Sequence, residues 1–203
     1  TALVYDAGGR ELFVYSGREE VFSLTQEDGQ ALLSADVNQN GWLAVTSQES
    51  GHKGSVTVYD NSYSPLVRFS LSNRFVMDAA VALLTIGLTD GNFESRVDLY
   101  RLDRTEEETE PDWTCPVGNN AILDLRWTSI GIWALGESGL YIVSGDGALS
   151  GSYDYGGRYL KAFSLDGDGT ASLLLGKYRA GSTAELLTIN ASGELAAALP
   201  VEE

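Results

Sequence analysis

Residues 32–71 read LLSADVNQNGWLAVTSQESGHKGSVTVYDNSYSPLVRFSL, and this stretch decides the fold. It contains four segments of strand length: LLSADV, GWLAVTSQ, SVTVYD and PLVRFSL. The turns between them are rich in Gly, Asn and Ser, which accept positive φ angles or bond back to their own backbone. Short strands joined by tight turns favour an antiparallel meander. The stretch therefore predicts one four-stranded sheet.

The same unit recurs three times further along the chain. The predicted copies cover residues 76–117, 122–155 and 160–200. Equivalent positions in the four first strands are Ala35, Ala79, Leu125 and Phe163, which gives steps of 44, 46 and 38 residues. Second strands such as WLAVT and IWAL are nearly continuous apolar runs, as expected for strands covered on both faces. A period of about forty residues with four strands is typical of β-propeller blades.

The N-terminal residues add a partial unit. Segments 2–5, 11–16 and 20–24 match the second, third and fourth strands of a blade, so the innermost strand is missing. We therefore predict an all-β fold, a β-propeller of four-stranded antiparallel blades with four complete blades and most of a fifth, forming part of a longer propeller. The predicted single domain spans residues 1–203, with blades at 1–29, 30–73, 74–119, 120–157 and 158–203. An incomplete ring exposes blade edges, so a homodimer is also expected in that case.

The composition excludes some classes of partner. The formal net charge of −16 argues against nucleic acid, because phosphate binding requires a basic surface. The single cysteine, Cys115, cannot form an internal disulfide. No apolar run approaches the length of a membrane span, and no signal peptide is evident at Thr1. A membrane link is therefore expected only through an N-terminal anchor outside this sequence.

Two loops resemble calcium-binding loops. Asp36, Asn38, Asn40 and Gly41 spell the opening of an EF-hand-type oxygen cage, and Asp166 with Asp168 in LDGDG suggests a second site. However, the twelfth position counted from Asp36 is a serine, where a bidentate glutamate is needed. Both loops also fall between first and second strands, where a turn uses Asp, Asn and Gly for backbone reasons. We therefore predict no metal, and a calcium-stabilised adhesion propeller stays open as an alternative.

The acidic run at residues 103–112, DRTEEETEPD, lengthens one connection between a third and a fourth strand. Six of its ten residues are acidic. Such a run is usually a solvated loop, and otherwise an acidic docking surface. It places negative charge on the side of the propeller opposite the loops described next.

Within the four complete units, five of the chain's thirteen Lys and Arg residues, together with the single histidine, fall in loops that emerge on one face of a propeller. These loops join second to third strands, or one blade to the next. The candidate binding residues in them are His52, Lys53, Arg74, Arg158, Lys177 and Arg179. Loops at such a face vary without disturbing the strands, so propellers bind there. We predict a non-catalytic interaction propeller that offers these side chains to a protein or a small anionic ligand.

An enzymatic function is the main alternative. A hydrolase or lyase would use acidic and phenolic groups in the central channel, and the nearest candidates are Asp78, Asp124 and Tyr159. His52 is the only histidine, and no nucleophile elbow, P-loop or dinucleotide fingerprint occurs. No nucleophile and base pair is recognisable. We therefore predict no catalytic residues and no cofactor.

The sequence NGWLAVTSQESGHKGSVTVYDNSYSPLVRF, followed by VMDAAV in the next unit, resembles an uncharacterised bacterial, Firmicutes-type β-propeller family of unknown function with WD40/PQQ-like repeats. Asn-Gly precedes the second strand, and a Gly-rich hairpin leads into a VTVYD strand. The resemblance implies a membrane-anchored protein with an extracytoplasmic propeller. It implies no activity and no catalytic residues. The anchor itself is not in this sequence.

Overall fold

The computed structural model describes residues 1–38, 40–81, 84–89, 94–101, 110–166, 169–181 and 183–201. Within these ranges the regular structure consists of nineteen strands and no helix. The described residues thus contain no helix capable of crossing a membrane. The predicted all-β class is confirmed.

The strands form five separate antiparallel sheets, each a meander in chain order. The N-terminal sheet contains β1 (Ala2–Tyr5), β2 (Glu11–Ser16) and β3 (Glu19–Thr25). The first blade contains β4 (Leu32–Val37), β5 (Leu43–Ser47), β6 (Gly54–Tyr59) and β7 (Pro65–Leu71). The second blade contains β8 (Phe75–Val81), β9 (Leu84–Thr89), β10 (Glu94–Tyr100) and β11 (Trp113–Asn119).

The last two blades repeat the pattern. The third blade contains β12 (Ile122–Thr128), β13 (Gly131–Gly136), β14 (Gly139–Val143) and β15 (Leu149–Asp154). The fourth blade contains β16 (Tyr159–Leu165), β17 (Ala171–Gly176), β18 (Ala184–Ile189) and β19 (Leu195–Val201). The predicted four complete units and the three-stranded partial unit are therefore all present.

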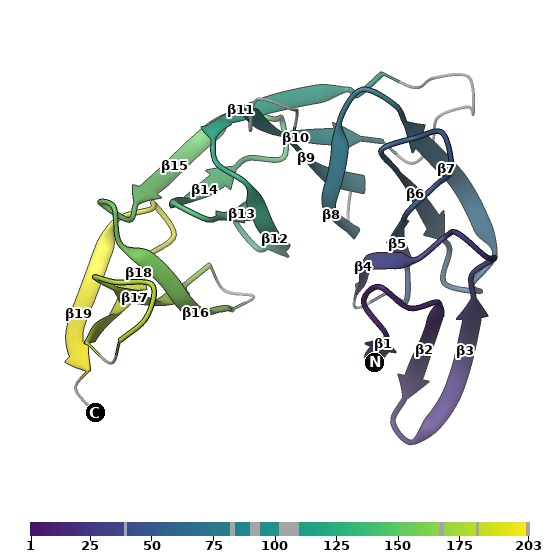
Figure 1. Ribbon diagram of the computed structural model, residues 1–203, viewed down its shortest axis with the longest axis horizontal. Helices are drawn as coiled ribbons and strands as arrows, with labels where there is room; N and C mark the ends of the chain where they lie inside the picture. Colours follow the sequence, from purple (N-terminus) through teal and green to yellow (C-terminus); the bar gives the residue numbers. More distant parts are fainter. Residues whose placement is uncertain are drawn as a thin grey trace.

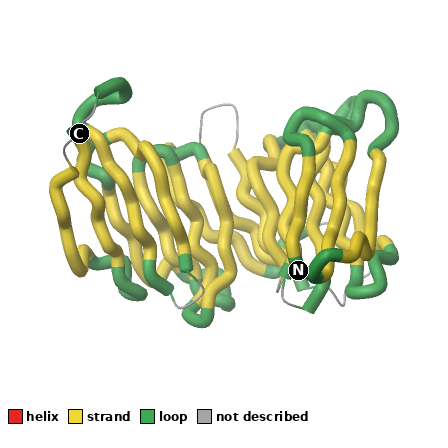
Figure 2. The backbone as a smooth tube through the Cα atoms, turned by 90° about the horizontal axis from the view of Figure 1, so that it is seen from below, coloured by secondary structure: helices red, strands yellow, loops and turns green. Residues whose placement is uncertain are grey.

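The sheets are arranged around a common centre, with the first strand of each complete blade innermost and the last outermost (Figure 1). The loops gather at the two ends of the strands (Figure 2). Because each blade is a meander, the β5–β6 and β17–β18 turns and the connections between blades share one end. The chain thus forms a β-propeller with two loop faces, as predicted.

The four inner strands carry the same irregularity. The pairing register with the second strand shifts by one residue near the start of β4, β8, β12 and β16. The extra residues at these β-bulges are Leu33, Met77, Leu123 and Lys161. A bulge bends its strand and redirects nearby side chains. The residues that follow the bulges, Ser34, Asp78, Asp124 and Ala162, are therefore structurally equivalent.

Apolar clusters between adjacent sheets hold the propeller together. Leu12 and Val45 belong to the cluster between the N-terminal sheet and the first blade. Val56 and Tyr100 belong to the cluster between the first and second blades. Two further clusters join the second to the third blade and the third to the fourth. Burial of apolar area between sheets is the main stabilising contribution in such a fold.

Two predicted features lie wholly or largely outside the described residues. Asp168, in the second calcium-like loop, is one of them. The acidic run is described only from Glu110 onward.

Candidate functional site

A cavity of about 660 Å³ lies where the first and second blades meet at one loop end. We call it the face pocket. Its walls come from the β3–β4 connection, β4, the β5–β6 turn and the start of β8. The lining residues are Gly29, Leu33, Gln48, Glu49, Ser50, His52, Lys53, Phe75, Val76 and Met77. Two predicted binding residues, His52 and Lys53, therefore share one cavity with several apolar side chains.

The β5–β6 turn fixes these two residues in place. The backbone N–H of Gln48 donates to Ala31 O, just before β4, at 2.8 Å. The backbone N–H of Lys53 donates to Leu71 O, at the end of β7, at 2.7 Å. Inside the turn, His52 N donates to Glu49 O at 3.1 Å. Gly51 has a φ of 81°, a left-handed conformation that glycine adopts without strain. The turn is therefore anchored to strands on both sides.

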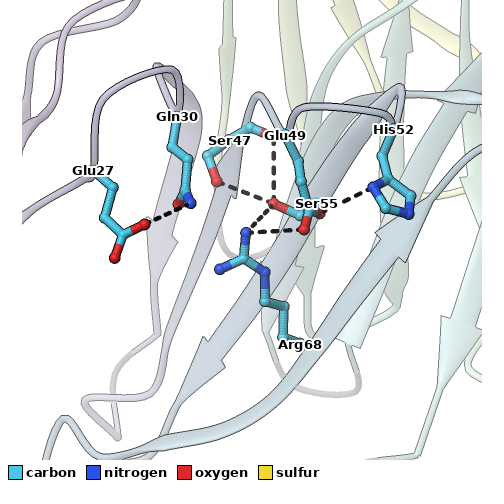
Figure 3. A network of polar contacts seen from close by, with 7 residues as sticks. All are labelled: Glu27, Gln30, Ser47, Glu49, His52, Ser55 and Arg68. Carbon is cyan, nitrogen blue, oxygen red and sulfur yellow. Dashed lines mark hydrogen bonds and ion pairs between the residues drawn. The ribbon is translucent and has the colours of Figure 1, made fainter.

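A chain of polar contacts runs behind the turn (Figure 3). Glu49 Oε1 lies 3.4 Å from Arg68 Nη2, and Glu49 Oε2 lies 4.0 Å from His52 Nδ1. Arg68 Nη2 also donates to Ser55 Oγ at 3.4 Å, and that hydroxyl lies 3.2 Å from Ser47 Oγ. Glu49 Oε2 is buried without a hydrogen-bond donor. The carboxylate is held mainly by Arg68, and its second oxygen faces His52.

Lys53 is the most prominent cation of the face pocket. Its Nζ donates to Asn73 O at 3.2 Å and lies 4.7 Å from the centroid of the Phe75 ring. Phe75 is 48% exposed although it is a large apolar residue at the start of β8. A lysine over an aromatic face gains a cation–π attraction. The pocket thus presents an oriented ammonium group beside an exposed ring.

A second cavity, of about 450 Å³, lies against the inner strands β1, β4, β8 and β12. We call it the channel pocket. Its polar lining residues are Tyr5, Ser34, Asp36, Asp78, Asp124 and Arg126. Its apolar lining residues are Leu3, Leu33, Ala35, Val37, Met77, Leu123 and Leu125. The bulge residues Leu33 and Met77 line both pockets and separate them.

Asp78 is the most buried carboxyl group of the channel pocket, with 8% of its surface exposed. Its Oδ1 accepts a hydrogen bond from Ala79 N and its Oδ2 accepts one from Leu125 N in the third blade, both at 2.9 Å. Ser34 on the first blade also hydrogen-bonds to it. Burial, helped by the charge of Asp124, raises the pKa of Asp78 to about 6. Asp78 therefore links three consecutive blades.

Asp124 occupies the equivalent position in the next blade and lies beside Asp78. The two side chains lie within hydrogen-bonding reach of each other. Burial raises the pKa of Asp124, whereas Arg126, from 3.7 Å away, and the contact with Asp78 act to lower it. Burial also raises the pKa of Tyr5, and the three nearby aspartates add to that rise. The wall of the channel pocket contains three aspartates and the Tyr5 hydroxyl, so ionisation of a further group there is unfavourable.

The three residues of the enzymatic alternative are only partly brought together. Asp78 and Asp124 are in contact, but both oxygens of Asp78 accept main-chain hydrogen bonds, which is a structural use of the carboxyl group. Tyr159 lies on β16, is 44% exposed and is not among the residues lining the channel pocket. The geometry gives no arrangement of nucleophile and base around these groups.

The other predicted cations lie at the same loop end but have separate surroundings. Arg74 donates to Glu94 O at 3.1 Å. Arg158 donates to Tyr155 O, Tyr153 Oη and Glu185 Oε2, at 2.7, 3.0 and 2.8 Å. Lys177 Nζ lies 5.5 Å from the Tyr178 ring centroid, and Arg179 Nη2 lies 3.9 Å from Glu137 Oε1. Only His52 and Lys53 of the six line the face pocket.

The first calcium-like loop forms a backbone turn in the structure. Asn38 Oδ1 accepts hydrogen bonds from Asn40 N at 2.9 Å and Trp42 N at 3.0 Å. Asp60 and Asn190 cap their own turns with the same pattern, accepting from residues two and four positions ahead. Among the described residues no group of three or more His, Cys, Asp or Glu is arranged to hold a metal ion. This shared geometry supports the turn interpretation of the loop.

Sequence reasoning missed four residues of the face pocket: Glu49, Phe75 and the bulge residues Leu33 and Met77. Glu49 lies in the same turn as His52, three residues before it, and Phe75 directly follows Arg74. Their importance depends on how two blades meet, which no local pattern reports. Cys115 is buried and free, its pKa is raised by that burial, and it packs in the second–third cluster as expected of a small apolar residue.

The sequence matches no protein-family model and no curated protein. Solved structures do match, at 11% identity in each of three cases. A protein of unknown function from Bacteroides caccae aligns with a TM-score of 0.60 over 97% of this chain and 71% of its own. The Cps50 (Swd1) β-propeller domain from Myceliophteria thermophila aligns with a TM-score of 0.64 over 95% of this chain and 67% of its own.

A third structure, BBS1N in complex with ARL6DN, aligns with a TM-score of 0.59 over 96% of this chain and 62% of its own. At this identity the three matches show the fold and nothing finer. This chain has the β-propeller fold. It spans between 62% and 71% of the three similar chains.

Proposed function

We propose that this chain is a non-catalytic interaction propeller that binds an acidic protein segment at the face pocket. One observation carries the proposal: Lys53 and His52 lie in a single cavity beside the exposed ring of Phe75. A lysine ammonium is a charge-assisted donor for a carboxylate, and the neighbouring apolar wall suits an apolar side chain. The BBS1N structure was solved in a complex with a protein, which supports a protein as the class of partner.

The remaining cations extend the same loop face around this pocket. We propose Arg74, Lys177 and Arg179 as outer contacts for a larger partner. Arg158 is engaged with Glu185 at 2.8 Å, so it contributes to binding only if that ion pair opens. The proposal therefore gives Lys53 and Phe75 the leading roles.

Fluorescence anisotropy with two labelled peptide pools tests the proposal. One pool places Asp and Glu beside Leu and Phe, and the other carries Lys and Arg at the acidic positions. We expect the acidic pool to bind, and Lys53→Glu to weaken its binding at least about 10-fold, since a charged hydrogen bond is lost and repulsion is added. The matched control, Arg101→Glu, reverses a 60% exposed charge at the other loop end.

We expect Arg101→Glu to change the affinity less than about twofold, as is usual for exposed charges. Binding of neither pool would overturn the proposal, and so would equal losses in the Lys53 and Arg101 variants. Phe75→Ala separates the apolar contribution from the charge. A bacterial origin, a membrane anchor and an extracytoplasmic location stay predictions from the family resemblance.

A further inference from the structure

The inner wall of the propeller contains a carboxyl pair that bridges two blades. Asp78 lies on β8 and Asp124 on β12, each directly after the β-bulge of its strand. The two carboxyl groups line the same pocket and lie within hydrogen-bonding reach of each other. Asp78 Oδ2 also accepts a hydrogen bond from Leu125 N at 2.9 Å, so a side chain of the second blade is hydrogen-bonded to the backbone of the third. The pair therefore belongs to the contact between the two blades and is not a cluster of surface charges.

We propose that Asp78 and Asp124 form a proton-sharing clasp between the second and third blades, which holds the inner strands together in acid and loosens when both carboxyl groups are ionised. The proposal concerns how pH affects the contact between these two blades, and it does not depend on the ligand proposed above. Two carboxyl groups in contact hold a proton between them because two adjacent negative charges repel each other.

The surroundings of the clasp favour the protonated form. Tyr5 on β1 and Asp36 on β4 face the same pocket, together with the hydroxyl of Ser34. Arg126 is the one cation among the described lining residues of the channel pocket, and its Nη2 lies 3.7 Å from Asp124 Oδ2. Asp124 Oδ2 is itself buried without a hydrogen-bond donor. One cation beside three carboxyl groups leaves the wall with an excess of negative charge once both clasp groups ionise.

The sign of the pH effect follows from the direction of the shift. The pKa of Asp78 is about 6 in the folded protein against an ordinary 3.8, so the folded state holds the proton more tightly than the unfolded chain. The clasp's contribution is therefore fully present below about pH 4 and is lost as the pH rises through about 6. A shift of this size corresponds to a change on the order of 100-fold in the folding equilibrium constant.

Urea denaturation at pH 4.5 and 7.5 tests the clasp in three proteins: wild type, Asp124→Asn and the control Asp6→Asn. In Asp124→Asn the amide donates a permanent hydrogen bond to Asp78, which imitates the protonated pair. We expect the folding equilibrium constant of the wild type to fall at least about 10-fold more than that of Asp124→Asn between the two pH values. Asp6 is an exposed turn residue, so Asp6→Asn controls for the loss of one charge from an acidic protein.

Equal pH dependence in the wild type and Asp124→Asn, within about twofold, would overturn the clasp. If Asp124→Asn does not fold, carboxyl ¹³Cγ NMR of the wild type gives the answer. The clasp requires Asp78 and Asp124 to titrate as a coupled pair, with one step above pH 5. Two independent titrations near the ordinary range of aspartate would refute it.

Discussion

The junction between the second and third blades differs from that between the third and fourth at one position of the repeat. Gly87 on β9 and Leu135 on β13 occupy this position, each paired with the aspartate of its inner strand. A Cβ atom added to Gly87 would lie 3.1 Å from two methyl carbons of Ile122, so the third blade packs directly against the glycine. Leu135 instead presents a full side chain, which is buried in the cluster shared with the fourth blade.

The inner strands reflect this difference. Leu125 of β12 packs against the second blade and is only 2% exposed, and its N–H donates to Asp78. Phe163 of β16, the equivalent residue in the fourth blade, is 41% exposed. We infer that a repeated carboxylate becomes a tie between blades only where the facing position is small enough for close approach. Where a leucine stands there, the middle strands provide the contact.

The largest expected effect lies at the third–fourth junction. Trp133 is fully buried in its cluster, so Trp133→Ala is expected to lower the free energy of unfolding by about 3–5 kcal/mol. Its Nε1 is buried without a partner, so Trp133→Phe keeps most of the packing and is expected to cost much less. Urea denaturation measures both. A cost below about 1 kcal/mol for Trp133→Ala would mean that the middle strands do not hold this junction.

The equivalent residues Leu125 and Phe163 test the comparison directly. Leu125→Ala is expected to cost about 2–5 kcal/mol, because the side chain is buried between two blades. Phe163→Ala is expected to cost far less, although it removes a larger side chain, because Phe163 already contacts solvent. Similar losses in the two variants would contradict the difference between the junctions.

Most of the fold was predictable because its determinants are local. Strand lengths, apolar second strands and Asn- or Gly-rich turns are all read from short windows, and the predicted segments correspond to the observed strands. The turn at Asn38 is an example, because the sequence NQNG already predicts a turn there and the Asn38 side chain accepts hydrogen bonds from its backbone. The repeat then implies the propeller, because such sheets bury their faces only against one another.

The candidate sites were less predictable because they form between blades. His52 and Lys53 were named from their loop, but Phe75 and Met77 join them only through the packing of the next blade. Gly87 in β9 leaves room for Ile122 and Leu125 of the next blade, and a β-bulge that shifts the register by one residue precedes both Asp78 and Asp124. The sequence indicates Asp78 and Asp124 as channel residues, but periodicity does not report a bulge, so it does not show that their carboxyl groups lie together.

A methyl group on Gly87 is expected to have an intermediate effect. Gly87→Ala places a carbon 3.1 Å from Ile122 in a fully packed junction, which is expected to cost about 1–3 kcal/mol. The same displacement separates Asp78 from Leu125 N, so the pH dependence attributed to the clasp is expected to weaken as well. Ile122→Val in the same chain makes room and is expected to restore part of the stability. A fully additive double variant would argue against direct contact between the two sites.

The smallest expected effect concerns an ion pair between the third and fourth blades. Arg179 Nη2 lies 3.9 Å from Glu137 Oε1, with side chains 84% and 63% exposed. Arg179→Ala is expected to change the free energy of unfolding by less than about 0.5 kcal/mol, because water and salt screen the pair. Urea denaturation at low and high salt measures this, and a loss above 1 kcal/mol would show that surface charge helps to hold this junction. Stability that stays unchanged has a further use, since any loss of peptide binding in Arg179→Ala would then report contact with the partner and not a change in the fold.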